Sequence, residues 1–229
     1  MPLTPNSNVS SFTDLSAIPE IHGFLHEASH PTGNTLVLTH GAGTNCQARL
    51  LVEISEAFAA SGFTVLRFDL PFRRDRPQGP PFPAVAAKDR DGLRRAVTLM
   101  KAKTRGRIFL GGHSYGGRQA SILLSEEPDI VDAVLLLSYP LHPPRKPTEL
   151  RTQHFPKLRT PALFVHGTRD PFATPDEMKS ALELIPAPHA IYEIESAGHD
   201  LLGKKSSGAT GIPSQIASKF KAFLEPQSK

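Results

Sequence analysis

The chain has 229 residues, of which 39% are hydrophobic and 21% are charged, and its formal net charge at pH 7 is +4. Its one cysteine excludes an internal disulfide, and a zinc ribbon or an iron–sulfur cluster would need more thiolates. No apolar run approaches the ~20 residues that cross a bilayer, and no basic and apolar leader opens the sequence. We therefore expect no transmembrane segment and a cytoplasmic protein of a reducing compartment.

The positive charge is not concentrated as it is in most nucleic-acid sites. Basic residues fall in short groups, at 73–76, 94–95 and 101–107, and 7% of the residues are aromatic, with no Trp. Nucleic-acid binders more often gather basic residues on one element and supply aromatic rings for stacking. We therefore disfavour a nucleic-acid partner and interpret the basic residues as a solvated face.

The first residues of the chain, 1–13, are polar and contain proline. This composition predicts a flexible N-terminal arm over residues 1–15, followed by a single domain over residues 16–226. The first apolar run, Ile21–His26, precedes a turn-forming segment at Pro31–Asn34. We expect this run to add an antiparallel hairpin at one edge of a sheet.

Apolar runs then alternate with stretches of helical period. The runs are Leu36–Thr39, Phe63–Phe68, Arg107–Leu110, Val131–Leu137, Ala162–Val165 and Ala190–Ile194. Most are continuously apolar, as expected of parallel strands that are covered on both faces. The helical stretches lie around Leu50–Phe58, Leu93–Met100, Met178–Ile185 and Ile216–Leu224. This alternation predicts an α/β fold, a mostly parallel sheet flanked by helices.

A G-x-S-x-G pattern follows the run Arg107–Leu110, at residues 112–116, and a helical stretch follows the pattern. In such sheets ligands bind beyond the carboxyl ends of the strands, which is where this pattern falls. A serine nucleophile needs a tight, strained turn at this point, and the flanking glycines make room for it. We therefore expect Ser114 to be a nucleophile.

A serine nucleophile needs a base, and the base needs a group that orients it. Among ten histidines, His199 follows the last strand run, whereas His189 precedes that run and His166 lies in a loop that it is expected to brace. Asp170 also follows a strand run. The order Ser114, Asp170, His199 is the chain order of one of the three known triad families.

An early glycine-rich turn predicts the oxyanion site. His40-Gly41-Ala42-Gly43 follows the run Leu36–Thr39. Acyl transfer needs two backbone N–H donors for the oxyanion, one of them from the residue after the nucleophile. We expect these donors to be the N–H groups of Tyr115 and Ala42.

With these residues in place, the chain resembles an α/β-hydrolase from about Ile21 to Leu224. The segment Gly111–Ser121 and the segment Phe68–Phe72 resemble those of the group that contains the testis-expressed-30 and KAT8-regulatory-complex-subunit-3 hydrolase-like proteins. In size the chain is also similar to dienelactone hydrolases, which carry a cysteine where this chain has Ser114. The resemblance implies the α/β-hydrolase fold and triad roles for Ser114, Asp170 and His199.

The walls of the site are expected near the carboxyl end of the run Phe63–Phe68. Phe72, Arg73 and Arg74 follow it and form a possible substrate rim, in which a guanidinium would bind a carboxylate or phosphate. The alternative is that these arginines are solvated loop residues. We expect Arg118 to pair with a neighbouring acid, with Asp69 as the candidate, rather than with a substrate.

The segment 139–160 stands where many α/β-hydrolases carry a helical lid. Its five prolines argue against a substantial helical cap, so we expect little or no lid domain. A flap that carries Leu141, His142, His154 and Phe155 is compatible with the sequence. Such a short cover favours a small or flexible acyl substrate.

Together these patterns predict a carboxylesterase-like serine hydrolase that cleaves a small ester, thioester or related acyl compound, with no cofactor and no metal. The alternative is a non-catalytic binding or scaffolding module on the same fold. A metal-dependent hydrolase built from His40, His166, His199 and Asp69 is disfavoured because no pair has metal-ligand spacing. The oligomeric state does not follow from the sequence.

Overall fold

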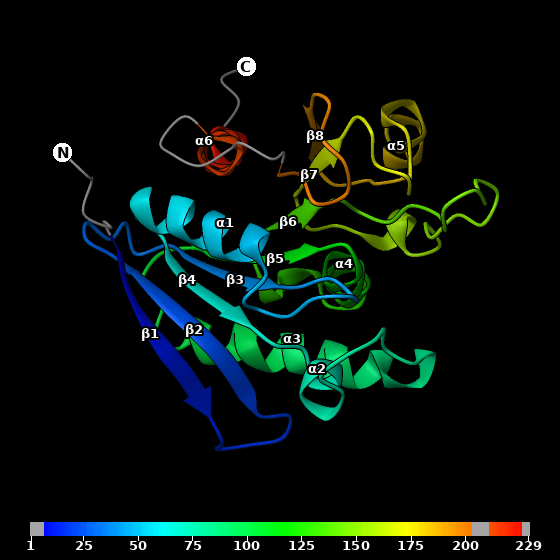
Figure 1. The fold of residues 1–229 in the computed structure, drawn as a ribbon. Coiled ribbons are helices and arrows are strands. Elements are labelled where there is room, and N and C mark those ends of the chain that lie inside the picture. Colours follow the sequence, from blue (N-terminus) through cyan, green and yellow to red (C-terminus); the bar gives the residue numbers. More distant parts are fainter. Residues whose placement is uncertain (1–6, 203–210, 226–229) are drawn as a thin grey trace.

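The computed structural model describes residues 7–202 and 211–225, and within them eight strands form one sheet (Figure 1). The strands are β1 (Ser7–Asp14), β2 (Ile21–Ala28), β3 (Thr35–Thr39), β4 (Thr64–Phe68), β5 (Ile108–His113), β6 (Ala133–Leu137), β7 (Ala162–Gly167) and β8 (His189–Ile194). Their order across the sheet is β1-β2-β4-β3-β5-β6-β7-β8. All neighbours from β4 to β8 run parallel, whereas β2 is antiparallel to both β1 and β4.

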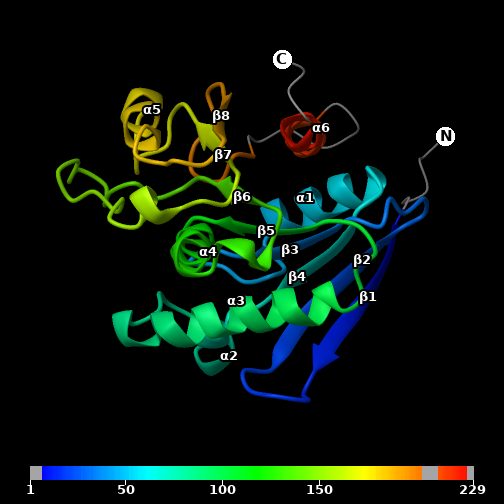
Figure 2. The ribbon, with the colours of Figure 1, turned by 180° about the vertical axis from the view of Figure 1, so that it is seen from behind.

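Helices cover both faces of this sheet, as Figures 1 and 2 show from opposite sides. The helices are α1 (Arg49–Ala60), α2 (Pro71–Asp75), α3 (Ala86–Lys101), α4 (Tyr115–Glu126), α5 (Pro175–Leu182) and α6 (Ile212–Leu224). Residues of α1 and α6 pack in one core, and residues of α3, α4 and α5 pack in the other. Among the described residues no helix is both long enough and apolar enough to cross a membrane.

The continuously apolar runs are the parallel strands, and their side chains supply the two cores alternately. In β3, Leu36 and Leu38 lie in the core under α1, whereas Val37 between them lies in the core under α3. All three are fully buried. Because successive side chains of a strand point to opposite faces, a strand covered on both sides must be apolar throughout. The predicted α/β architecture is confirmed.

The prediction of a flexible N-terminal arm is wrong over residues 7–14. These residues form β1, which pairs with β2 along its whole length, from Ser7 opposite Ala28 to Asp14 opposite Ile21. The hairpin therefore joins β1 to β2, and β2 does not pair with β3. An edge strand is held by its backbone and can carry polar side chains on its open face, so its composition gave no sign of it. Residues 1–6 lie outside the described residues.

The segment between β6 and β7 forms no helical cap. Its helical part is one 3₁₀ turn at Phe155–Lys157, and a hydrogen bond of 2.6 Å from the Tyr139 hydroxyl to the Arg151 carbonyl ties its two halves together. Leu141 and Phe155, expected on a flap, are fully buried and belong to the core. The segment is thus anchored to the molecule.

Phe220→Ala in α6 tests the core under α1 and α6. The Phe220 ring is fully buried, 5.7 Å from the ring of Phe58 and 5.3 Å from that of Phe109. Loss of the ring leaves a cavity, so we expect the free energy of unfolding in urea to fall by about 3–5 kcal/mol. Phe223→Ala, at a partly buried ring of the same helix, should cost clearly less. Equal losses in the two variants would contradict this account.

Candidate active site

Ser114 stands in a strained turn between β5 and α4. Its backbone has φ +50° and ψ −113°, a region that L-residues rarely occupy. Its N–H donates to the Leu137 carbonyl at 2.8 Å, which holds the turn against β6. Two residues on, a Cβ added to Gly116 would lie 2.5 Å from the His40 carbonyl oxygen, so only glycine fits there. The G-x-S-x-G pattern thus serves both the turn and the close contact with the His40 backbone.

The structure brings Ser114, His199 and Asp170 into one hydrogen-bonded chain. The Ser114 Oγ lies 2.9 Å from His199 Nε2, and His199 Nδ1 lies 2.8 Å from Asp170 Oδ2. A carboxylate only accepts, so His199 Nδ1 donates its proton to Asp170, and Nε2 is left free to accept from the Ser114 hydroxyl. The Asp170 side chain is fully buried, and its other oxygen accepts from the Phe172 N–H at 2.9 Å.

Two rings hold His199 in place. The Phe172 ring packs on it with 4.3 Å between ring centroids. His113, with its ring 5.1 Å away, donates from Nε2 to the His199 carbonyl at 2.9 Å. Burial is the main cause that lowers the pKa of His113 to about 4, so this imidazole is neutral at pH 7. His113 had no predicted role, although its position directly before Ser114 was a signal in the sequence.

The glycine-rich turn after β3 is braced from inside the molecule. His40 is fully buried, donates from Nδ1 to the Gly41 carbonyl at 2.8 Å, and accepts at Nε2 from the Leu70 N–H at 3.1 Å. Arg73 donates to the carbonyls of Ala42 and Thr44, at 2.6 and 2.8 Å. The loop therefore has a defined backbone without belonging to a helix or strand.

The predicted substrate rim of Phe72, Arg73 and Arg74 is wrong. Phe72 is buried with its ring 5.5 Å from that of Tyr115, and Arg73 is buried with its guanidinium on loop carbonyls. Arg74 is exposed and faces a separate hollow beside Asp75. The cause is α2, which begins at once at Pro71 and turns Arg73 back under the loop. The alternative, that these arginines are solvated loop residues, is also wrong for Arg73, because Arg73 is buried.

Arg118 also differs from its predicted role. Asp69, its expected partner, instead accepts from the Cys46 N–H at 2.7 Å and lies 3.6 Å from His40 Nε2. Arg118 lines the cleft beside Ser114. Cys46 is a buried thiol whose pKa burial raises to about 12, so it behaves as a small apolar residue, as expected.

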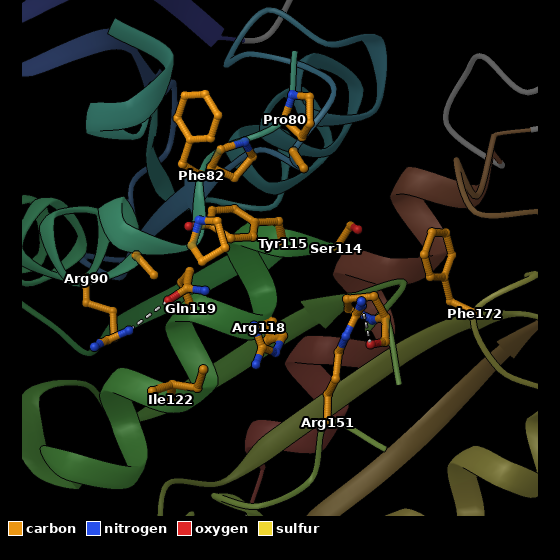
Figure 3. A pocket seen from close by; sticks show the side chains of 15 residues that line it. Pro80, Phe82, Arg90, Ser114, Tyr115, Arg118, Gln119, Ile122, Arg151 and Phe172 are labelled. Carbon is orange, nitrogen blue, oxygen red and sulfur yellow. Dashed lines mark hydrogen bonds between the residues drawn. The ribbon is translucent and has the colours of Figure 1, made fainter. Parts of the chain in front are cut away.

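A cleft of about 550 Å³ opens beside Ser114 (Figure 3). Residues of α4 line one side, the proline-rich loop 80–83 lines another, and Pro140, Arg151 and Phe172 complete the wall. Its lining residues are Ala42, Pro80, Pro81, Phe82, Pro83, Ala86, Arg90, Ser114, Tyr115, Arg118, Gln119, Ile122, Pro140, Arg151 and Phe172. The loop 80–83 was not predicted to line the site, although its prolines were a signal in the sequence.

The histidines considered for a metal site are engaged elsewhere. His166 lies 2.8 Å through Nε2 from the Ala173 carbonyl, so it braces its loop as predicted. Within residues 7–202 and 211–225, no group of three or more His, Cys, Asp or Glu side chains is arranged to hold a metal ion.

Comparison with known proteins bears on this geometry. A family model described as an alpha/beta hydrolase domain matches residues 32–225. The uncharacterized protein YqkD of Bacillus subtilis is 26% identical over 80% of this chain and 71% of its own length. A dienelactone hydrolase of Anabaena variabilis has a similar fold, with a TM-score of 0.72, 18% identity and 96% and 97% of the two chains covered. A lid-less α/β serine hydrolase of Xanthomonas campestris superposes over both whole chains, with a TM-score of 0.68 and 14% identity.

Gly116→Ala tests the close contact between α4 and the His40 backbone that supports the turn at Ser114. Its Cβ would lie 2.5 Å from the His40 carbonyl oxygen, so either α4 or the loop must move. We expect the free energy of unfolding to fall by about 1–3 kcal/mol. Gly43→Ala is the matched control, because a Cβ there meets no atom within 4 Å. The same loss in both variants would rule out the contact as the cause.

Acid should destabilise the protein through its buried histidines. Burial is the main cause that lowers the pKa from 6.5 to about 4 in His26, His40, His113 and His154. Between these values the unfolded chain binds more protons than the folded one, so the free energy of unfolding falls as the pH drops from about 6.5 to about 4. Urea midpoints at pH 7.5, 6 and 5 measure this fall.

His26→Gln gives the matching control for that measurement. His26 accepts from Arg67 Nε at 2.8 Å, and a glutamine keeps an acceptor but does not titrate. The pH dependence should become shallower in His26→Gln and stay unchanged in His30→Gln, at an exposed histidine. If the free energy of unfolding of His26→Gln falls as steeply with pH as that of the wild type, protonation of His26 does not contribute to the acid destabilisation.

Proposed function

The chain belongs to the alpha/beta-hydrolase family, and from this premise we propose that it is a serine hydrolase that cleaves a small ester or thioester. The observation that carries the proposal is the hydrogen-bonded chain from Ser114 through His199 to Asp170. The segment Gly111–Ser121 also supports the proposal that the chain belongs to the testis-expressed-30 group. We further propose that the protein is cytoplasmic.

The reaction runs through an acyl-enzyme. The Ser114 Oγ attacks the acyl carbonyl while His199 Nε2 takes its proton, and His199 then gives that proton to the leaving alcohol or thiol. Asp170 keeps the Nδ1 proton of His199 in place and stabilises the imidazolium that forms. Water deprotonated by His199 then attacks the acyl-enzyme, which releases the acid and restores Ser114.

Two backbone N–H groups stabilise the oxyanion in this proposal. Tyr115 begins α4, so its N–H has no carbonyl partner within the helix. The Gly41 carbonyl accepts from His40, and in a trans peptide the Ala42 N–H points the opposite way. Ala42 and Tyr115 both line the cleft with Ser114, which supports these two donors. Such a donor contributes about 3–4 kcal/mol to lowering the barrier.

The cleft favours a small acyl group. Its cover is the short loop 80–83, and the segment between β6 and β7 carries no helical cap among its described residues. Long acyl chains need an extended apolar surface to bury them, at roughly 0.8 kcal/mol per methylene group. A carboxylesterase-like activity on short or compact acyl esters follows.

Ser114→Ala tests the proposal directly. The wild-type protein should react covalently with a fluorophosphonate probe and hydrolyse p-nitrophenyl esters of short acids, and Ser114→Ala should lose both by a factor of about 10³ or more, because the nucleophile is gone. Gel fluorescence and intact mass measure the labelling.

Ser125→Ala is the control, because Ser125 lies on the same helix α4 and its hydroxyl bonds to the Ile122 carbonyl. Ser125→Ala should react with the fluorophosphonate probe to the same extent as the wild type. Labelling that persists in Ser114→Ala would overturn the assignment of Ser114 as the nucleophile. A folded wild type that neither labels nor hydrolyses any ester would favour the non-catalytic binding module instead.

A further inference from the structure

Two arginines of the cleft have no role in the reaction just described. Arg118 of α4 and Arg151 of the segment between β6 and β7 both line the cleft that holds Ser114. Figure 3 shows both side chains below Ser114 in that view. Arg151 donates to the Pro140 carbonyl at 3.2 Å, which holds its guanidinium against the wall. The Nε of Arg118 is buried without any hydrogen-bond partner.

No carboxylate in the cleft pairs with these two arginines. The cleft lining contains no Asp or Glu, and no ion pair within the described residues involves either Arg118 or Arg151. The third arginine, Arg90 of α3, donates to Gln119 of α4 at 3.1 Å and lies 4.0 Å from the Glu126 carboxylate. Of the three cleft arginines, Arg118 and Arg151 thus have no ion-pair partner, although the charge of Glu149, outside the cleft lining, raises the pKa of Arg151.

The two guanidinium groups act on each other and on their neighbours. Burial, and then the charge of Arg118, lowers the pKa of Arg151. The same two causes lower the pKa of His154 to about 4, so this neighbour is neutral at pH 7. Like charges held together at the wall of a cleft are unfavourable unless an anion lies between them. The two guanidinium groups therefore offer N–H donors and positive charge to an anion that enters the cleft.

We propose that Arg118 and Arg151 bind a terminal oxyanion, a carboxylate or phosphate group, at the far end of the substrate's acyl chain. This inference rests on the proposed serine hydrolase function and names its substrate class. Guanidinium groups suit both oxyanions, because each presents a planar fork of N–H donors.

The spacing along α4 sets the length of the acyl chain. Arg118 follows Ser114 by one helical turn, and its N–H donates to the Ser114 carbonyl at 2.9 Å. Ser114 is the N-cap of α4, and the four residues from it to Arg118 rise by about 6 Å along the helix axis. We take this rise as the length scale of the acyl chain, and about four methylene groups span it. The substrate class is thus an ester or thioester of a medium-length dicarboxylic acid, or its phosphate-terminated equivalent.

The test compares esters that differ only in their terminal group. Mono-p-nitrophenyl adipate ends in a carboxylate, p-nitrophenyl 6-methylheptanoate replaces that group by an uncharged branch of similar shape, and a third ester ends in a phosphonate. Wild-type kcat/KM, after subtraction of the enzyme-free rate, should favour a charged ester over the neutral one by about 10- to 100-fold. The charged ester that is preferred identifies the oxyanion.

Arg118→Gln and Arg151→Gln should each reduce this preference by about 10-fold or more, mainly through a higher KM for the charged ester. Arg118→Lys should retain part of it, because the charge stays and the fork is lost. Arg74→Gln is the matched control, since it removes one positive charge that faces a different hollow, and it should keep the wild-type preference.

The possible failures are distinguishable. If the wild type hydrolyses the neutral ester as fast as both charged esters, Arg118 and Arg151 do not bind a terminal carboxylate or phosphate. The serine hydrolase proposal would be unaffected. Equal loss of preference in Arg74→Gln and Arg118→Gln would also overturn it, since net charge would then be the cause. Absence of hydrolysis for all three esters, with no probe labelling of Ser114, would overturn both proposals.

Discussion

The strained backbone of Ser114 is the constraint on which the rest of the site depends. A non-glycine residue at φ +50° costs about 1–3 kcal/mol, and it persists only where its surroundings hold it. Here the Leu137 carbonyl binds the Ser114 N–H, and the first turn of α4 packs on the His40 backbone. The turn directs Oγ away from the sheet, so His199, from the loop after β8, reaches it at 2.9 Å.

The buried polar side chains around this turn share one function, which is to hold backbone carbonyls. His40 binds that of Gly41, Arg73 binds that of Ala42, and His113 binds that of His199. Burial keeps His40 and His113 neutral at pH 7, so they add no charge beside His199. Loops outside helices and strands thereby gain fixed geometry, which preorganised catalysis requires.

The cleft owes its character to two segments that carry little regular structure. The loop 80–83 contributes three prolines, whose fixed φ limits how far it can move. The segment between β6 and β7 is tied down by the Tyr139 hydroxyl, and so presents Arg151 to the cleft. Because Ser114 directly precedes α4 and Arg118 lies in the first turn of that helix, both are positioned by the same rigid element.

The sequence by itself determined the parallel strands, because continuous apolar runs suit only strands covered on both faces, and it determined the order in which Ser114, Asp170 and His199 follow strand ends. It did not reveal β1, whose pairing is made by its backbone. Only the tertiary structure decided which arginines face the cleft: α2 turns Arg73 away, whereas α4 and the anchored segment after β6 bring Arg118 and Arg151 together. The physical reason is that side-chain direction depends on packing between segments far apart in the chain, which composition and spacing do not record.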